Sequence, residues 1–147
     1  MNVAIEVARD AHVHEILPRL RGREQKLVAG ILDPAAALID EVRASSEAYA
    51  VLFDGAVACL WGIQARSILA DAVYLWMLTS RAMEEHPIAA GRHSRRMCRR
   101  VLAQYATIEG VVALDNPTSR RWLEWLGARF EPSPIRGMLA FKLRRAE

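Results

Sequence analysis

Arginines crowd one short segment of the chain, "GRHSRRMCRR", which starts at Gly91. From Cys98 onward, Val101, Leu102 and Tyr105 follow at helical spacing, which predicts an amphipathic helix. The start of such a helix offers free N–H groups and a partial positive charge to an anion, and arginines add charged donors to phosphate. The alternative is a solvated basic face. The arginines of this segment are Arg92, Arg95, Arg96, Arg99 and Arg100.

The stretch "DNPTSRRWLEWLGARF" has a second spacing with a chemical meaning. Asn116 is able to cap a helix and to tie the end of the strand before it. Trp122, Leu123 and Trp125 are expected to bury one face of that helix, and Gly127 fits a left-handed C-cap. The chain's four tryptophans are expected to pack in the core, with an acyl or acceptor pocket as the alternative for Trp76; they are Trp61, Trp76, Trp122 and Trp125.

Metal and thiol chemistry are not indicated. His12, His14 and Glu15 are too local and too few for a metal site. Cys59 and Cys98 lack the partner pattern of a metal site or a disulfide framework, so we expect buried free thiols.

Length and composition predict one domain over 1–147. No apolar run approaches the roughly 20 residues needed to cross a bilayer. The first residues, "MNVAIEVARDAHVHE", lack the features of a secretory signal peptide, so a soluble intracellular protein is expected. The net charge of +3 does not by itself argue for nucleic acid.

The elements that position these residues alternate along the chain. The broken apolar pattern after His12 predicts a broken helix or two short ones, and Asp33-Pro34 begins another. Asp54-Gly55 between two apolar runs predicts a hairpin. The expected strands span 2–8, 47–53, 56–64, 72–80, 111–115 and 137–145.

Strand 72–80 is apolar on both faces and is expected mid-sheet, covered by helices. The Arg-rich helix that follows is expected to end near Glu109–Gly110, and a crossover of this kind implies some parallel pairing. The fold class is therefore α/β (α+β), a mixed, mostly antiparallel sheet flanked by helices.

This order of elements resembles the GNAT N-acetyltransferases. Many members close with an Asn at a strand end, a helix carrying a Leu-Tyr-Glu-like triplet, and a Leu-Gly pair. Here Asn116 begins the pattern, 122–124 fill the triplet, and Leu126-Gly127 close the helix without a gap.

The chain also resembles a phage family, the GNAT-like internal virion proteins of podoviruses. The likeness covers nearly the whole chain and rests on the order of four segments. They are Leu20–Gln25, Tyr74–Thr79, Ser94–Leu102 and Arg120–Gly127.

The GNAT resemblance implies acetyl-CoA as cofactor, held by N–H groups where the central strand parts from its neighbour and where the next helix begins. The family's loop has two close glycines, which let the backbone approach the phosphates. The matching "HPIAAGRHSRR" has only Gly91, which weakens the site without excluding it. The residues assigned to the cofactor are Leu78, Thr79, Gly91, Arg92, His93, Ser94, Arg95, Arg96 and Asn116.

The resemblance also requires a proton donor and a base. Leu123 stands where many members have the Tyr that protonates the leaving thiolate, and leucine cannot transfer a proton. Glu84, Glu85 and His86 are assigned to the base, with solvated loop residues as the alternative. His93 is expected to face solvent, beside arginines that depress its pKa.

Two functions follow. The missing glycine and Leu123 favour a phage virion or assembly protein whose degenerate acetyltransferase site still binds acyl-CoA. Its partners would be phage structural proteins or a host protein, in the virion or the host cytoplasm. The parent fold favours an active acetyltransferase for a small-molecule or protein amine.

Other partners are less well supported. Nucleic acid is disfavoured because no aromatic platform interleaves with the arginines. A second copy is expected to pair, if at all, through an edge strand at 137–145.

Overall fold

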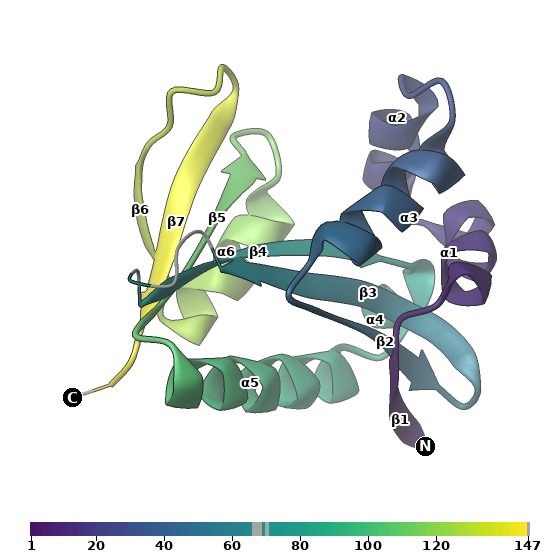
Figure 1. Ribbon diagram of the computed structural model, residues 1–147, viewed down its shortest axis with the longest axis horizontal. Helices are drawn as coiled ribbons and strands as arrows, with labels where there is room; N and C mark the ends of the chain where they lie inside the picture. The colour runs from purple at the N-terminus through teal and green to yellow at the C-terminus, as the bar shows by residue number, and fades with distance from the viewer. Residues whose placement is uncertain (66–68, 70, 147) are drawn as a thin grey trace. The chain divides into compact units, whose positions relative to one another are not determined.

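The computed structural model describes residues 1–65, 69 and 71–146 (Figure 1). The chain divides into two compact units, of which the first comprises Met1–Gln64 with Trp76–Gly91 and the second Ala65–Leu75 with Arg92–Glu147. The boundary crosses a strand and a long helix, so both elements contribute to both units. One domain over the whole chain stays a prediction.

Seven strands and six α-helices make up the described part of the chain. The strands are β1 (Val3–Val7), β2 (Glu47–Phe53), β3 (Ala56–Ala65), β4 (Ala72–Thr79), β5 (Thr107–Ala113), β6 (Arg129–Pro132) and β7 (Met138–Arg144). The helices are α1 (Asp10–Ile16), α2 (Gly22–Ala29), α3 (Pro34–Ala44), α4 (Arg81–Glu85), α5 (Pro87–Gln104) and α6 (Pro117–Leu126), with a 3₁₀ turn at Leu17–Arg19.

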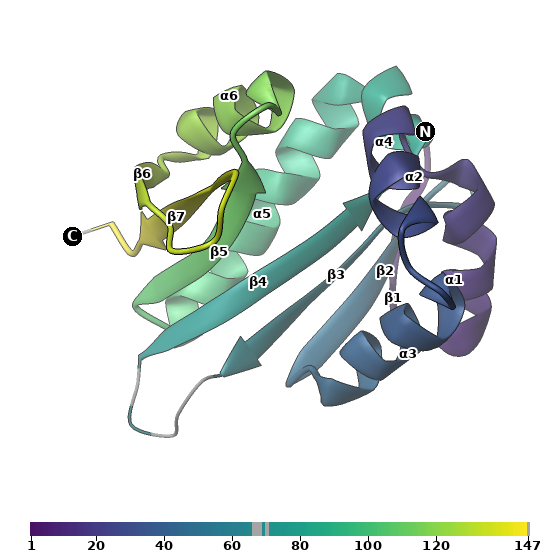
Figure 2. The same ribbon diagram turned by 90° about the horizontal axis from the view of Figure 1, so that it is seen from above.

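The strands form one hydrogen-bonded order, β1-β2-β3-β4-β5-β7-β6. β1, β2 and β3 pair antiparallel in sequence, as do β5 with β7 and β7 with β6. β4 and β5 are parallel. The α/β class, the mixed and mostly antiparallel sheet and the mid-sheet place of β4 are therefore confirmed. Figure 2 shows β5, β7 and β6 side by side.

The first unit follows its local signals closely. Asp54 and Gly55 have φ angles of 49° and 85°, the left-handed values that a tight hairpin between β2 and β3 needs. The broken helix is α1, the 3₁₀ turn and α2. Asp33 caps α3 by accepting from the N–H of Ala36 at 3.1 Å, and Pro34 occupies the first turn.

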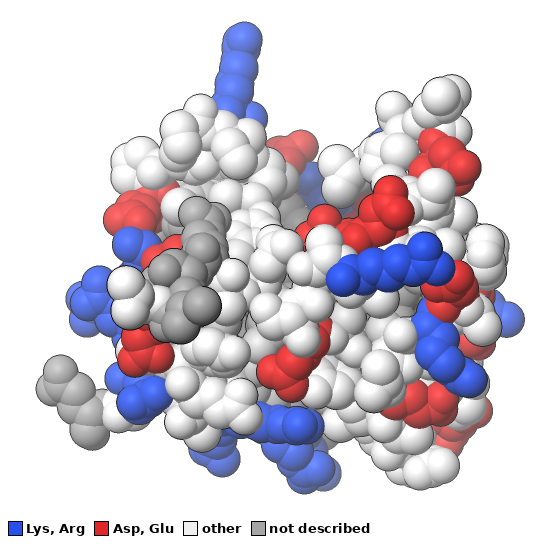
Figure 3. All heavy atoms as spheres, in the orientation of Figure 1, with Lys and Arg blue, Asp and Glu red and all other residues white. Residues whose placement is uncertain are grey.

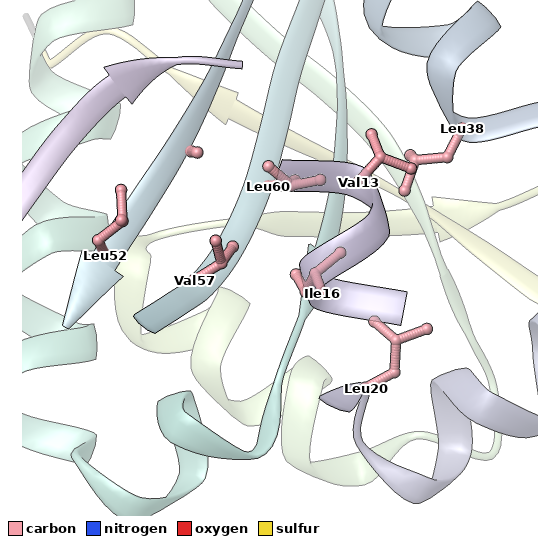
Figure 4. Packing of buried hydrophobic residues seen from close by; sticks show 8 residues of the cluster. Val13, Ile16, Leu20, Leu38, Leu52, Val57 and Leu60 are labelled. Carbon is pink, nitrogen blue, oxygen red and sulfur yellow. The ribbon is translucent and has the colours of Figure 1, made fainter. Parts of the chain in front are cut away.

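One hydrophobic cluster holds the first unit together. Side chains of α1, α3 and the segment between α1 and α2 pack against β2 and β3 (Figure 4). Burial of each such side chain stabilises the unit by roughly 1.5–3 kcal/mol. The labelled members are Val13, Ile16, Leu20, Leu38, Leu52, Val57 and Leu60.

In the second unit, the predicted end of the Arg-rich helix is wrong. α5 ends at Gln104, and Glu109 and Gly110 lie inside β5, which begins at Thr107 rather than at 111. Gly110 is not a helix stop. A Cβ there would lie 2.5 Å from the Phe141 ring of β7, so glycine is required by a close approach within the sheet.

The predicted edge strand is also wrong. β7 matches the expected strand at 137–145, but it lies between β5 and β6. β6, which the sequence did not predict, takes the edge. The strand expected to pair with a second copy therefore has a strand of its own chain on each side.

The tryptophans divide. Trp61 is buried, and the half-buried Trp76 donates its N–H to Ser45 Oγ at 2.7 Å and lies where a Cβ on Gly62 would be. Trp76 is thus accounted for by packing. Trp125 was expected in the core and is half exposed.

No helix among the described residues is long and apolar enough to cross a bilayer.

Candidate functional site

The parallel ladder between β4 and β5 is short. It joins Ala72–Tyr74 to Thr107–Glu109, while β4 continues to Thr79 and β5 to Ala113. Beyond the ladder β5 stays paired with β7. The sequence predicted that the central strand parts from its neighbour, and a parallel ladder this short agrees with that prediction.

The last residue of β4 is hydrogen-bonded to the carboxylate of Glu24 on α2. Thr79 donates its backbone N–H to Glu24 Oε2 at 2.7 Å and its hydroxyl to Glu24 Oε1 at 2.8 Å. Arg21 donates to the same carboxylate at 2.8 Å, and its own N–H bonds to the carbonyl of Thr79 at 3.3 Å. The backbone N–H of Thr79, assigned to the cofactor from the sequence, is therefore already bonded within the chain.

Arg21 is also the link to the next helix. Its Nε is buried without a hydrogen-bond partner among the described residues and lies 3.7 Å from Glu84 Oε1. Gln25 fixes the same turn by donating to the carbonyl of Leu20 at 3.0 Å. Residues of the segment Leu20–Gln25 thus contact the end of β4 and hold it by hydrogen bonds. This role was not predicted from the sequence.

Ser80 turns the chain from β4 into α4. Its buried hydroxyl lies 2.9 Å from the carbonyl of Ala58 and accepts from the N–H of Ala82 at 3.3 Å, capping α4. The neighbouring Leu78 packs against the hydrophobic cluster. The backbone after Thr79 is therefore held rigidly.

The three side chains assigned to a base lie together after this turn. Glu84, Glu85 and His86 are all exposed. The His86 ring packs edge-to-face on Phe53 with centroids 6.0 Å apart, and its carbonyl accepts the N–H of Ala90 at the start of α5. Their exposure places all three side chains within reach of solvent or of a ligand.

α5 is already helical where a glycine-rich loop was sought. It begins at Pro87, so Gly91 is an ordinary helical residue. No acidic residue lies in the first turn, which leaves the positive end of the helix dipole unopposed by its own side chains. The start of α5 is thus a helix N-terminus of the type that binds anions.

The polar residues of α5 lie on two faces. Arg92, Arg95 and Arg96 are exposed, whereas His93 and Ser94 are buried. In Figure 3 basic side chains gather at the edge of the view where Figure 1 places α5. The Arg95 guanidinium lies 4.0 Å from the centre of the Trp125 ring. This cation–π contact gives each of these two exposed side chains a partner within the chain.

His93 does not face solvent, contrary to the prediction. Desolvation by burial, and then the charge of Arg96, lowers its pKa below the ordinary 6.5, so the expected direction of the pKa shift is confirmed. Its Nε2 is buried with no hydrogen-bond partner among the described residues. A buried polar atom without a partner is rare in native proteins.

The motif around α6 is structural at both ends. Asn116 accepts the N–H of Ser119 at 3.2 Å, and Gly127 has a φ of 101° and donates back into the last turn. Leu123 is buried, so the position of the family's acid carries neither a proton nor access to a ligand. The capping roles predicted for Asn116 and Gly127 are confirmed, while contact between Asn116 and a cofactor stays a prediction.

The thiols are buried and free, as expected. Burial, with a further contribution from the charge of Glu24, raises the pKa of Cys59 to about 12, and burial raises that of Cys98 to about 11. Neither is a nucleophile at neutral pH. Among the described residues, no group of three or more His, Cys, Asp or Glu side chains is placed to hold a metal ion.

Comparisons with known proteins give the fold. An acetyltransferase from Thermus thermophilus matches with a TM-score of 0.76 at 10% identity, covering 99% of this chain and 98% of that one. A GNAT-family acetyltransferase from Bacillus anthracis matches with a TM-score of 0.73 at 9% identity, covering 98% and 95%. The PaiA N-acetyltransferase from Thermoplasma acidophilum, solved in complex with coenzyme A, matches with a TM-score of 0.72 at 10% identity, covering 99% and 100%.

No family model and no curated protein matches the sequence. At these identities the likeness establishes architecture rather than activity. This chain has the fold of the GNAT acetyltransferases.

Proposed function

We propose that this chain binds an acyl-CoA, with the phosphates at the start of α5 and the acyl end near the end of β4. The observation that carries the proposal is the match, over nearly its whole length, to an N-acetyltransferase solved with coenzyme A. When bound, acetyl-CoA would supply an acetyl group activated as a thioester.

The residues at the start of α5 fit such a ligand. The first turn of α5 carries no acidic side chain of its own, and a pyrophosphate would bind at this positive end of the helix. Arg92 and Arg96 are exposed on the following turns and are able to add charged hydrogen bonds.

The end of β4 fits less well. Glu24 already holds the N–H and hydroxyl of Thr79, so a thioester carbonyl would have to displace a carboxylate to reach that donor. Leu123 is buried and supplies no proton to a leaving thiolate. We therefore propose binding without efficient acetyl transfer, which agrees with a degenerate acetyltransferase site.

Isothermal titration with acetyl-CoA tests the proposal. We expect micromolar binding by the wild-type chain and a loss of roughly 1.5–3 kcal/mol, about 10- to 100-fold, for Arg92→Ala, because one charge-assisted phosphate contact is removed. Arg99→Ala is the matched control: it removes the same charge from an exposed position two turns further along α5. An absence of binding at millimolar acetyl-CoA, or equal losses in both variants, would contradict it.

An active acetyltransferase is the second candidate, favoured by three exposed titratable side chains directly after the strand end. They would take the proton from an acceptor amine. Release of free CoA thiol in the presence of small amines or a lysine peptide, abolished by combined substitution of Glu84, Glu85 and His86, would establish transfer. Binding without thiol release would support the degenerate site.

A role in a phage particle rests on the four sequence segments that resemble podovirus virion proteins. Mass spectrometry of purified particles from a phage encoding this chain tests it. Recovery of the chain with phage structural proteins would support the role, and its absence from particles would count against packaging.

A further inference from the structure

The two edges of the sheet differ. β6 is short and is followed closely by proline, with Arg129, Glu131, Pro132 and Pro134 in and beside it. Charges and prolines at an edge prevent pairing with another chain. β1 has neither proline nor a basic residue over Val3–Val7. β1 is therefore the edge that is open to another strand.

Among the residues that the structure describes, the backbone of β1 pairs with β2 and with no other strand. Asp54 donates its N–H to the carbonyl of Asn2 at 2.8 Å, and Ala8 donates to the carbonyl of Ala48 at 3.0 Å. Backbone bonding alternates along an antiparallel strand, so the even-numbered residues of β1 bond to β2 and the odd-numbered ones direct N–H and C=O outward. The outward residues are Val3, Ile5 and Val7.

The same three residues expose apolar side chains on one face. Val3 is 42% exposed, Ile5 45% and Val7 70%. A run of outward backbone groups and exposed β-branched side chains on the same residues is suited to strand addition.

The sequence of β1 is complementary to a second, antiparallel copy of itself. In an antiparallel pair centred on Ile5, Val3 of one copy lies opposite Val7 of the other, so one face is entirely apolar. Glu6 then lies opposite Ala4, and no two carboxylates meet. Moving the register so that Glu6 meets its own copy would set like charges opposite each other, which is unfavourable.

Glu6 also has partners within its own chain. Its carboxylate lies 3.4 Å from Arg9 Nη2 and 3.4 Å from His12 Nε2. An isologous two-fold contact is the commonest form of homo-oligomer, and it requires this kind of self-complementary patch.

We propose that the outer edge of β1 pairs antiparallel with β1 of a second copy, with Ile5 opposite Ile5. Each of the three outward pairs exchanges two backbone hydrogen bonds. A contact made chiefly by one short strand from each copy is small, so the dimer dissociates on dilution.

Light scattering and sedimentation equilibrium on the full chain, over a concentration series, test the dimer. The wild-type chain should approach twice its monomer mass at high concentration. Ile5→Pro removes only the outward N–H and should raise the dimer dissociation constant at least tenfold with the fold kept, since proline is tolerated where an edge N–H faces solvent. Ile5→Lys should do the same by repulsion across the axis, should the proline variant fail to fold.

Crosslinking tests the register. Residues in a hydrogen-bonded pair have Cα atoms about 5.5 Å apart, within disulfide range. Ile5→Cys should crosslink to itself under mild oxidation, and Val3→Cys should crosslink to Val7→Cys only when the two variants are mixed. A wild-type chain that stays monomeric, a dimer unaffected by Ile5→Pro and Ile5→Lys, or an Ile5→Cys variant that forms no disulfide would each overturn the proposal.

Discussion

α6 follows strand β5 and α5 follows the short helix α4, and the starts of the two helices differ in what lies beside them. At α6, Asn116 accepts a backbone N–H and Gly127 closes the last turn, with Leu123 buried between them. At α5, no acidic side chain opposes the first turn, and the buried Nε2 of His93 lacks a partner among the described residues. The start of α6 is capped by its own chain, whereas the start of α5 is where we propose that a ligand binds.

The difference shows how a family-like motif should be interpreted. The residues of 116–127 match the GNAT pattern most closely, yet they act as caps and packing. The residues around α5 match it poorly, but no acidic side chain lies in the first turn of that helix. The motif at 116–127 therefore indicates the fold, and a ligand site has to be argued from the geometry of the residues themselves.

The largest effect is expected at the strand end before α5. Glu24→Ala would leave Thr79 without these acceptors for its N–H and hydroxyl and would remove the nearer of the two carboxylates beside the largely buried Arg21. Loss of a buried, hydrogen-bonded ion pair costs about 3 kcal/mol of unfolding free energy, which urea unfolding would measure.

Asp10→Ala is the control for that substitution, because Asp10 pairs with Arg43 at the exposed surface at 3.2 Å. Its cost should be below about 1 kcal/mol. Equal costs for the two variants would show that the carboxylate on Thr79 does not hold the strand end.

Sequence patterns that act within a few residues predicted the fold well. The hairpin at Asp54-Gly55 and the caps at Asp33, Asn116 and Gly127 depend on local backbone geometry, and each was confirmed. The predicted end of α5 was wrong because the glycine at 110 is needed for close contact with the ring of Phe141. Phe141 lies about 30 residues later in the chain, so local spacing cannot reveal this contact.

The candidate site was less predictable for the same reason. The bond between Glu24 and Thr79 joins residues 55 positions apart, and nothing in "LRGREQ" marks its carboxylate as the one that meets β4. The burial of His93 also depends on the tertiary packing of α5. The arginines of α5 and the group 84–86 could be named from the sequence because each set is contiguous in the chain and is recognised by residue type.

A smaller effect is expected at α6. Asn116→Ala should lower the unfolding free energy by about 1 kcal/mol because the cap of α6 is lost, and Asn116→Asp should retain most of it. Acetyl-CoA affinity should be unchanged in Asn116→Asp. Weakened binding in that folded, capped variant would show that Asn116 serves the ligand as well.

The last prediction concerns pH and the buried imidazole. The folded chain resists protonation of His93, since its pKa is lowered, whereas the unfolded chain protonates it near 6.5. Below that pH the unfolded state binds more protons, so stability falls as pH decreases and is unaffected by this group above it. Urea midpoints between pH 5 and 8 should therefore fall less steeply toward acid in His93→Gln than in the wild type; identical slopes would contradict the assignment.

The most direct measurement is a titration of the isotope-labelled chain with acetyl-CoA, followed by backbone amide shifts in NMR spectra. We expect the largest shifts at 79–80 and 88–96, with Asn116–Gly127 little changed. No shifts at millimolar ligand, or shifts confined to α6, would contradict the claim that the start of α5 is the ligand site.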